Sequence, residues 1–139
     1  MRSIKKSNKL WAQAEELIPA GTQSLSKSPT SFVDGVAPKY IIRASGCIMI
    51  DVDGNEYIDY GMALGPIILG YNHPVTNRAI IKQLKNGIIF SLLNPLEVEL
   101  AKLLNSLIPC AEMVRFGKNG SDATTIAVRV ARAYTGKDK

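Results

Sequence analysis

Residues 116–124 read Phe-Gly-Lys-Asn-Gly-Ser-Asp-Ala-Thr, and this stretch decides how the chain is interpreted. The apolar run from Met113 to Phe116 predicts a strand, and the amphipathic pattern after the turn predicts a helix from about Ser121. A glycine-bearing turn between a strand and a helix N-terminus gathers free backbone N–H groups, and the helix dipole favours negative charge there. We therefore expect a phosphate-binding site near the end of the 139-residue chain.

Two groups in this turn are the candidates for holding a phosphate. They are the backbone N–H groups of Gly120 and Ser121, to which the Ser121 hydroxyl could add a third hydrogen bond. The alternative is that Ser121 is only the N-cap of the helix, and the spacing does not separate the two interpretations. The chain contains neither the Gly-x-x-x-x-Gly-Lys-Ser/Thr pattern nor the Gly-x-Gly-x-x-Gly pattern, so the turn is not a common nucleotide site.

The composition suits a globular domain with its own core, because 46% of the residues are hydrophobic and 21% are charged. The net charge of +5 is concentrated near the two ends of the chain, and basic residues do not alternate with aromatic ones. This distribution favours a solvated basic face over a nucleic-acid surface. The longest uncharged run, between Gly61 and Arg78, is interrupted by glycine and proline and predicts no membrane span. No signal core follows the basic N-terminus, so we expect a cytoplasmic location.

Periodicity and capping residues predict most of the secondary structure. An antiparallel meander is expected from strands at 40–43, 48–52 and 56–60, with a hairpin turn at Asp53-Gly54. Asn94, Pro95 and Glu97 are a cap, an N1 proline and an N3 acid, which together predict a helix start. The helices are expected at 7–18, 74–86, 95–108 and from about 121 to a glycine cap at 136.

The predicted fold class is α/β with an incomplete parallel sheet. A strand–turn–helix unit belongs to a mostly parallel sheet, whose strands need companions, and residues 113–116 are the one good candidate strand. The apolar stripes of residues 96–108 and 123–134 therefore need partners that this chain supplies only in part. We expect a loosely folded or aggregation-prone species when the chain is expressed alone.

Residues with metal-binding or nucleophilic side chains form no recognisable motif. Cys47 and Cys110 are interpreted as two buried thiols, and together with a single histidine they predict no metal site. Asp51, Asp53 and Asp59 lie in or beside the predicted hairpin and are assigned turn and edge roles rather than a catalytic pairing.

Several segments together resemble the class III aminotransferases. They occur in the order and spacing of that family from about residue 8 to Lys139. Within the class, the chain looks most like glutamate-1-semialdehyde 2,1-aminomutase and its relatives. The segments that carry the resemblance are 51–60 (Asp-Val-Asp-Gly-Asn-Glu-Tyr-Ile-Asp-Tyr), 65–74 (Gly-Pro-Ile-Ile-Leu-Gly-Tyr-Asn-His-Pro), 97–101, 113–116 leading into 120–124, and 131–136.

The resemblance implies pyridoxal 5′-phosphate as cofactor, the type I fold of enzymes that use it, and a homodimer with active sites at the subunit interface. It divides the chain into an N-terminal arm with a small-domain segment, 1–72, and the start of the large cofactor-binding domain, 73–139. The family motif Ser-Gly-Thr-Glu-Ala, which binds the cofactor phosphate, corresponds here to Asn-Gly-Ser-Asp-Ala at 119–123. The phosphate-binding role is carried over to Asn119, Gly120 and Ser121.

Two positions that the resemblance assigns to a small-molecule amino substrate depart from the aminomutase. In the loop after the first helix Ser24 keeps a family serine, but Lys27 replaces the arginine that holds the substrate carboxylate. Lysine keeps the charge and loses the bidentate fork. Leu64 stands where the aminomutase has a tryptophan. These changes favour a relative that acts on another amino compound, such as an amino sugar, as strongly as the aminomutase.

The resemblance also implies that the Schiff-base lysine and the aspartate that pairs with the cofactor ring lie beyond residue 139. We therefore expect no catalytic residue in this chain and no activity from the chain alone. One alternative is a phosphate-binding half of a split enzyme that pairs with a separate C-terminal chain. A basic nucleic-acid binder is the weakest alternative.

Overall fold

The structure is a computed structural model that describes residues 2–138. The chain divides into two compact units between Gly87 and Ile88, and each unit is described separately below. The domain boundary inferred from the family resemblance, between residues 72 and 73, stays a prediction.

The first unit begins with helix α1 (Lys5–Leu17), which has no side-chain cap from a neighbouring residue. Its N-terminus is capped instead by Asp53, which lies in the turn between the second and third strands. The backbone N–H of Lys6 donates to Asp53 Oδ1 at 2.8 Å, and that of Ser7 donates to Oδ2 at 2.9 Å. The predicted helix at 7–18 is confirmed with slightly shifted bounds, and a distant carboxylate supplies the cap that its own sequence lacks.

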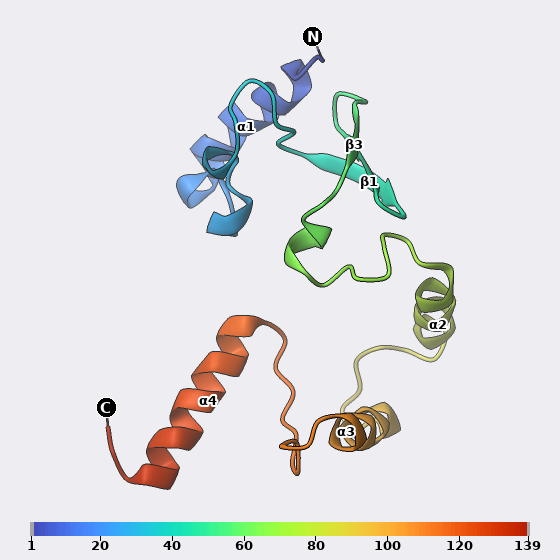
Figure 1. The fold of residues 1–139 in the computed structure, drawn as a ribbon, viewed down its shortest axis with the longest axis vertical. Coiled ribbons are helices and arrows are strands. Elements are labelled where there is room, and N and C mark those ends of the chain that lie inside the picture. Colours follow the sequence, from blue (N-terminus) through green and yellow to red (C-terminus); the bar gives the residue numbers. More distant parts are fainter. Residues whose placement is uncertain (1, 139) are drawn as a thin grey trace. The chain divides into compact units, whose positions relative to one another are not determined.

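Three strands follow, β1 (Ile41–Ser45), β2 (Ile48–Asp51) and β3 (Glu56–Ile58), and Figure 1 shows them close to α1. They form one antiparallel sheet in the order β1-β2-β3. The N–H of Gly54 donates to the carbonyl of Asp51 at 3.0 Å, which closes the β2–β3 turn at the predicted Asp53-Gly54 position. The predicted meander is confirmed.

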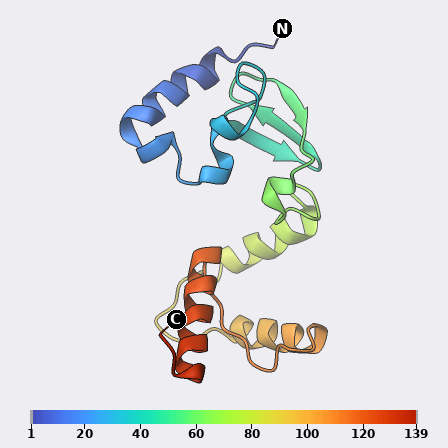
Figure 2. The ribbon, with the colours of Figure 1, turned by 60° about the vertical axis from the view of Figure 1, so that its left-hand side comes forward.

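The loop between α1 and β1 contains three short helices, η1 (Pro19–Gly21), η2 (Leu25–Lys27) and η3 (Pro29–Ser31), which Figure 2 shows in blue tones. A glycine is required in η1 by packing. A Cβ built on Gly21 would lie 2.6 Å from Cη2 of Trp11, and the residue has φ +66°. The small residues of this loop thus let the backbone approach the Trp11 ring of α1.

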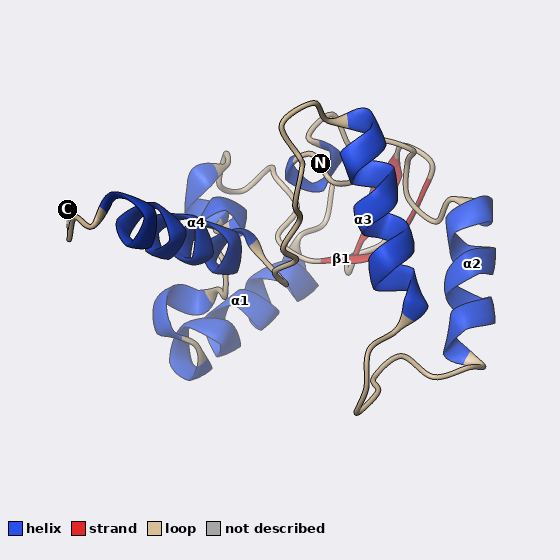
Figure 3. Cartoon of the chain, turned by 90° about the horizontal axis from the view of Figure 1, so that it is seen from below, coloured by secondary structure: helices blue, strands red, loops and turns tan. Residues whose placement is uncertain are grey.

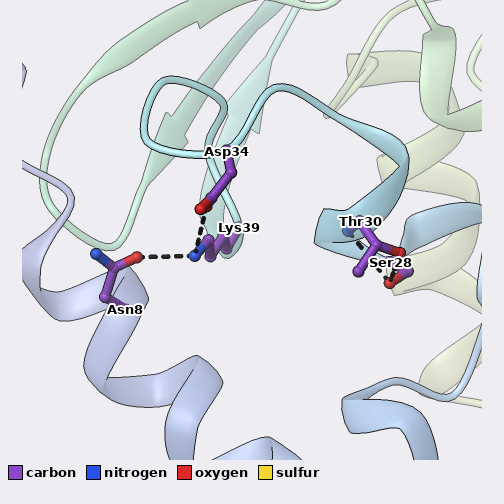
Figure 4. A network of polar contacts seen from close by, with 5 residues as sticks. All are labelled: Asn8, Ser28, Thr30, Asp34 and Lys39. Carbon is purple, nitrogen blue, oxygen red and sulfur yellow. Dashed lines mark hydrogen bonds and ion pairs between the residues drawn. The ribbon is translucent and has the colours of Figure 1, made fainter.

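A polar network also joins α1 to the segment before β1 (Figure 4). The ammonium of Lys39 donates to Asn8 Oδ1 at 2.8 Å and lies 3.3 Å from Asp34 Oδ1. In the same loop, the Ser28 and Thr30 hydroxyls are 2.8 Å apart. The Lys39 side chain is 10% exposed and that of Asp34 is 88% exposed. Packing therefore restrains the lysine, whereas the aspartate lies in solvent.

The first unit ends with helix α2 (Pro74–Leu84), and the second unit contains α3 (Pro95–Leu107) and α4 (Gly120–Thr135). The predicted start of α3 is confirmed. Asn94 Oδ1 accepts from the N–H of Leu96 at 2.9 Å, and the N–H of Asn94 donates to Glu97 Oε1 at 3.1 Å. Gly136 caps α4 in the left-handed conformation, at φ 66°, as predicted.

The strand predicted at Met113–Phe116 is absent from the described residues. Figure 3, in which strands are red and loops tan, shows only loop between α3 and α4. A strand is stabilised by the ladder of hydrogen bonds with its neighbour, and the described part of the second unit contains no other strand to pair with. The strand prediction for residues 113–116 is therefore wrong for this structure.

Little apolar surface is buried within residues 2–138. Ala14, at 9% exposure, is the apolar residue that forms the described core, whereas Leu100 and Leu107 of α3 are 46% and 68% exposed. The predicted apolar stripes therefore lie largely in solvent. Cys47 and Cys110 are both exposed, so the prediction of two buried thiols is wrong, and the reason is the same shortage of packed apolar surface.

Across the described residues, no helix combines the length and apolar character that crossing a membrane requires.

Candidate functional site: a capped helix N-terminus and a left-handed turn

The turn before α4 is organised by a reciprocal cap between Asn119 and Asp122. Asn119 Oδ1 accepts a hydrogen bond from the N–H of Asp122 at 2.9 Å. Asp122 Oδ2 accepts from the N–H groups of Lys118 and Asn119 at 3.1 Å and 3.2 Å. Asn119 is therefore the N-cap, and the alternative in which Ser121 is the N-cap is excluded.

This cap leaves two backbone donors free. Gly120 and Ser121 are the first two residues of α4, where an N–H group has no acceptor inside the helix, and no acceptor for either lies in the described part of the chain. A Cβ built on Gly120 would meet no protein atom within 4 Å, so the space beside these donors is open. Two free N–H groups, the Ser121 hydroxyl and the positive end of a 16-residue helix fit a phosphate group.

The residues just before this turn pack closely against the first turn of α4. A Cβ on Gly117 would lie 3.1 Å from Cβ of Asp122, which fixes the chain before the turn against the first turn of α4. A cavity of about 390 Å³ is lined there by Phe116, Gly117, Lys118 and Asp122, together with Thr125 and Ile126. Gly120 and Ser121 do not line this cavity, so the free donors and the cavity are separate features of the second unit.

The residues predicted to contact substrate lie in the first unit. Ser24 precedes η2, with its hydroxyl 3.0 Å from that of Ser26, and Lys27 is an exposed residue at the end of η2. Leu64 lies in the loop after β3 and is 60% exposed. The structure thus places Ser24 and Lys27 on one loop and Leu64 on another, and their shared role stays a prediction.

The loop that carries Leu64 has an unusual backbone. Met62, Ala63 and Leu64 have φ values of 46°, 52° and 68°, and none of them is glycine. The N–H of Leu64 donates to the carbonyl of Gly61 at 2.8 Å, and that of Gly65 donates to Met62 at 2.9 Å. Residues 62–64, the left-handed turn, therefore form one turn of left-handed helix, which costs about 1–2 kcal/mol for each residue that has a Cβ.

Asp59 and Tyr71 lie at the two ends of this loop and are bonded to each other. The Tyr71 hydroxyl donates to Asp59 Oδ2 at 2.7 Å. This hydrogen bond is the main reason why the pKa of Asp59 is lowered, and it raises the pKa of Tyr71 to about 12. The sequence assigned Asp59 only a turn or edge role, and its sole signal for the left-handed turn was a pair of flanking glycines, Gly61 and Gly65.

No described group of three or more His, Cys, Asp or Glu side chains is placed to bind a metal ion. The carboxylates in the turn around residues 51–55 have other partners. Asp51 accepts from Asn55 and Tyr57, and Asp53 accepts from the N-terminus of α1. Their oxygens serve as structural acceptors.

Comparison with known proteins gives close matches along the whole chain. Over 137 residues it is 47% identical to 3-aminobutyryl-CoA aminotransferase of Cloacimonas acidaminovorans (strain Evry), and the match covers 98% of this chain and 33% of that relative. The chain thus spans about a third of the length of this curated relative. A transaminase solved with pyridoxal phosphate bound superposes with a TM-score of 0.86 at 34% identity, covering 100% of this chain and 32% of the other.

A glutamate-1-semialdehyde aminomutase from Pseudomonas aeruginosa PAO1 also superposes, with a TM-score of 0.74 over 96% of this chain and 29% of the other. Its identity is 19%, so this likeness shows the fold alone. The fold class expected from the sequence, the N-terminal part of the type I fold of pyridoxal-phosphate enzymes, is confirmed by the transaminase structure. The family model "Aminotransferase class-III" matches residues 33–139, which is more than half of the chain. The chain belongs to the class III aminotransferases.

Proposed function

We propose that this chain holds the phosphate end of pyridoxal 5′-phosphate in a class III aminotransferase. The observation that carries the proposal is the pair of free N–H groups at Gly120 and Ser121, beside open space at a capped helix N-terminus. These donors, with the Ser121 hydroxyl, would bind the phosphate oxygens, and the α4 dipole would favour their charge. Asn119 would contribute by holding the turn in shape, because its side-chain oxygen is already used by Asp122.

Pyridoxal phosphate, when bound, supplies the electron sink that allows an amino group to be moved between two substrates. In this proposal the described residues bind and orient one end of the cofactor. We further propose that the 139 residues do not catalyse transfer alone, because the resemblance places the lysine that reacts with the cofactor beyond them.

Binding of two related probes tests the phosphate role. The purified chain should bind pyridoxal 5′-phosphate more tightly than pyridoxal, which lacks the phosphate, by about tenfold or more. Ser121→Ala should weaken binding of the phosphate form alone. Ser106→Ala is the matched control, because the Ser106 hydroxyl donates to Leu103 within α3. Equal binding of the two probes by the unmutated chain would contradict the proposal.

Chemical trapping tests the absence of a reactive lysine. Borohydride treatment of the chain with pyridoxal phosphate should leave no adduct concentrated at one lysine, as read by peptide mass spectrometry. A stoichiometric adduct at a single lysine among the 11 in the chain would show that the chain carries its own reactive group. Recovery of transfer activity on adding a separate C-terminal chain would favour the split-enzyme alternative.

For the substrate, we propose an amino group on the β-carbon of an acyl compound. The support is the 47% identity to a 3-aminobutyryl-CoA aminotransferase. The aminomutase substrate has less support, since Lys27 and Leu64 depart from that enzyme and the aminomutase structure matches at fold level only. Rates measured with 3-aminobutyryl compounds and with glutamate 1-semialdehyde would distinguish the two, and faster turnover of the semialdehyde would overturn this choice.

We also propose a cytoplasmic homodimer for the complete aminotransferase, because the family resemblance implies active sites at a subunit interface. Light scattering of the holoenzyme should give the mass of two subunits. A monomer that retains full activity would contradict this proposal.

A further inference from the structure

The left-handed conformation of residues 62–64 is energetically unfavourable, because all three residues carry a Cβ. Strained backbone of this kind persists only where its surroundings over-determine it, and such sites are concentrated where function requires a preset geometry. The contacts that hold the turn therefore indicate what the fold is built to preserve.

The Asp59 carboxylate holds the turn directly. The N–H of Gly61 donates to Oδ1 at 2.8 Å, and the N–H of Ala63 donates to Oδ2 at 3.2 Å. Both oxygens thus accept from the backbone of the loop. The direction of the Ala63 N–H is set by the backbone torsions of Met62, which has φ 46°. An extended conformation at Met62 would turn this N–H away from the carboxylate, so the pair of bonds favours the left-handed form where the turn begins.

Asp59 is itself fixed to the sheet. Its N–H donates to the carbonyl of Cys47 at 2.8 Å, and its Oδ2 accepts from the Tyr71 hydroxyl at 2.7 Å. Tyr71 is in turn paired with Gly46 by two backbone hydrogen bonds, of 2.9 Å and 2.8 Å. Both ends of the loop are therefore anchored to the turn between β1 and β2.

The held turn contributes one apolar side chain, that of Met62, to the lining of a cavity, and Leu64 lies outside that lining. Met62 and Leu64 are 44% and 60% exposed, whereas Ala63 is half-buried. A cavity of about 290 Å³ is lined by Met62, Ile67, Asp59 and Tyr71, among others. The conformation of the turn thus decides the direction in which the exposed Leu64 side chain leaves the backbone.

We propose that Asp59, locked by Tyr71, is the positioning residue that imposes the left-handed turn and thereby sets the substrate selectivity exerted at Leu64. The inference rests on the proposed aminotransferase function and on the substrate contact that the family resemblance implies for Leu64. Asp59 touches no reacting atom in this role. It acts through the backbone of residues 61–64 and through the side chain that they carry.

The test uses the aminotransferase holoenzyme that carries these residues. It measures substrate selectivity in an Asp59 variant and then asks whether a second substitution restores it. Asp59→Asn removes one of the two backbone acceptors, since an amide offers one oxygen. It should change the ratio of KM values for 3-aminobutanoate and 3-amino-3-phenylpropanoate about tenfold, with a smaller change in kcat. Leu64→Ala should change the same ratio, and the double variant should add little beyond it.

Ala63→Gly provides the rescue. Glycine adopts positive φ without a Cβ penalty, so in the Asp59→Asn background it should restore most of the selectivity. It should not restore the stability of Asp53→Asn, the matched control, because Asp53 caps α1 and makes no bond to the turn. Amide hydrogen exchange at Ala63 and Leu64 gives a readout that needs no activity, and Asp59→Asn should accelerate it.

Faster exchange in Asp59→Asn with an unchanged KM ratio would overturn the proposal, since the turn would then be structural only, and the proposed function would stand. Unchanged exchange would overturn the claim that Asp59 holds the turn. A holoenzyme with no aminotransferase activity would overturn the proposed function and the selectivity role with it, while the exchange measurement would still decide whether Asp59 holds the turn.

Discussion

Asp53 Oδ2 accepts a hydrogen bond from the backbone N–H of Ser7 at 2.9 Å, across 46 positions of sequence. With the 2.8 Å bond from Lys6 to Oδ1, it makes a carboxylate in the β2–β3 turn the N-terminal cap of α1. This contact joins the first helix to the sheet, because α1 has no local side-chain cap.

The first prediction is that Asp53→Ala releases the N-terminus of α1. Two donors lose their acceptor, and the negative charge at the positive end of the helix dipole is removed. Amide exchange at Lys6 and Ser7 should accelerate, and the melting temperature should fall. Asp34→Ala is the control, because Asp34 is 88% exposed and pairs only at the surface with Lys39. Equal effects of the two variants would contradict the prediction.

The second prediction is that the sheet loses stability in acid through protonation of Asp51. Burial acts to raise the pKa of Asp51, but hydrogen bonds from Asn55 and Tyr57 outweigh it, so the pKa of this fully buried carboxyl is lowered. A lowered folded-state pKa contributes stability above the unfolded value, near 3.9, and that contribution is lost as pH falls through the folded value. The sheet should therefore lose stability below about pH 4. Circular dichroism from pH 6 downward checks this, and an Asp51→Asn variant with an unchanged acid transition would refute it.

The third prediction is that the alkaline titration of Tyr71 depends on Asp59. The hydrogen bond to Asp59 raises the pKa of Tyr71 to about 12. A raised pKa contributes stability below the unfolded value, near 10, that is lost as pH rises through the folded one. Asp59→Asn should shift the Tyr71 titration toward its ordinary range. Ultraviolet absorbance of tyrosinate measures this, with Tyr71→Phe identifying the signal among the five tyrosines. An unshifted titration would show that the 2.7 Å bond does not persist in solution.

The fourth prediction compares two glycines. Gly21→Ala would place Cβ 2.6 Å from the Trp11 ring at φ +66°, and should destabilise the first unit by about 1–3 kcal/mol. Gly120→Ala adds a Cβ in open space and should leave the melting temperature nearly unchanged. If Gly120 lies against the cofactor phosphate, the same variant should weaken binding of pyridoxal 5′-phosphate more than binding of pyridoxal. Thermal melts and binding titrations of both variants check the pair.

The ends of the helices could be predicted from local sequence. Asn94 and Glu97 form the predicted box at the start of α3, and Gly136 ends α4 as predicted. These features depend on residues within four positions of each other, so the sequence carries them directly. Asn119 and Asp122 have the same capping-box spacing, so the cap of α4 is also a local feature of the sequence, although it lies at Asn119 rather than at Ser121.

The strand predicted at Met113–Phe116 shows the opposite case. Its apolar pattern is compatible with a strand, but a strand forms only with a partner that supplies the ladder, and the described residues of its unit supply none. The left-handed turn was missed for a related reason. Met62, Ala63 and Leu64 have no local preference for positive φ, so nothing in their own identities predicts it.

The sequence by itself determined the positions of the helices and the meander, because caps, periodicity and spacing are local properties, and its motifs carried the resemblance to the family. The tertiary structure alone decided that Asp53 caps α1, that Asp59 and Tyr71 hold a left-handed turn, and that Gly120 faces open space. The first two depend on groups far apart in the chain, whose contacts exist only once the backbone has folded, and the third depends on which atoms the folded chain places beside the helix.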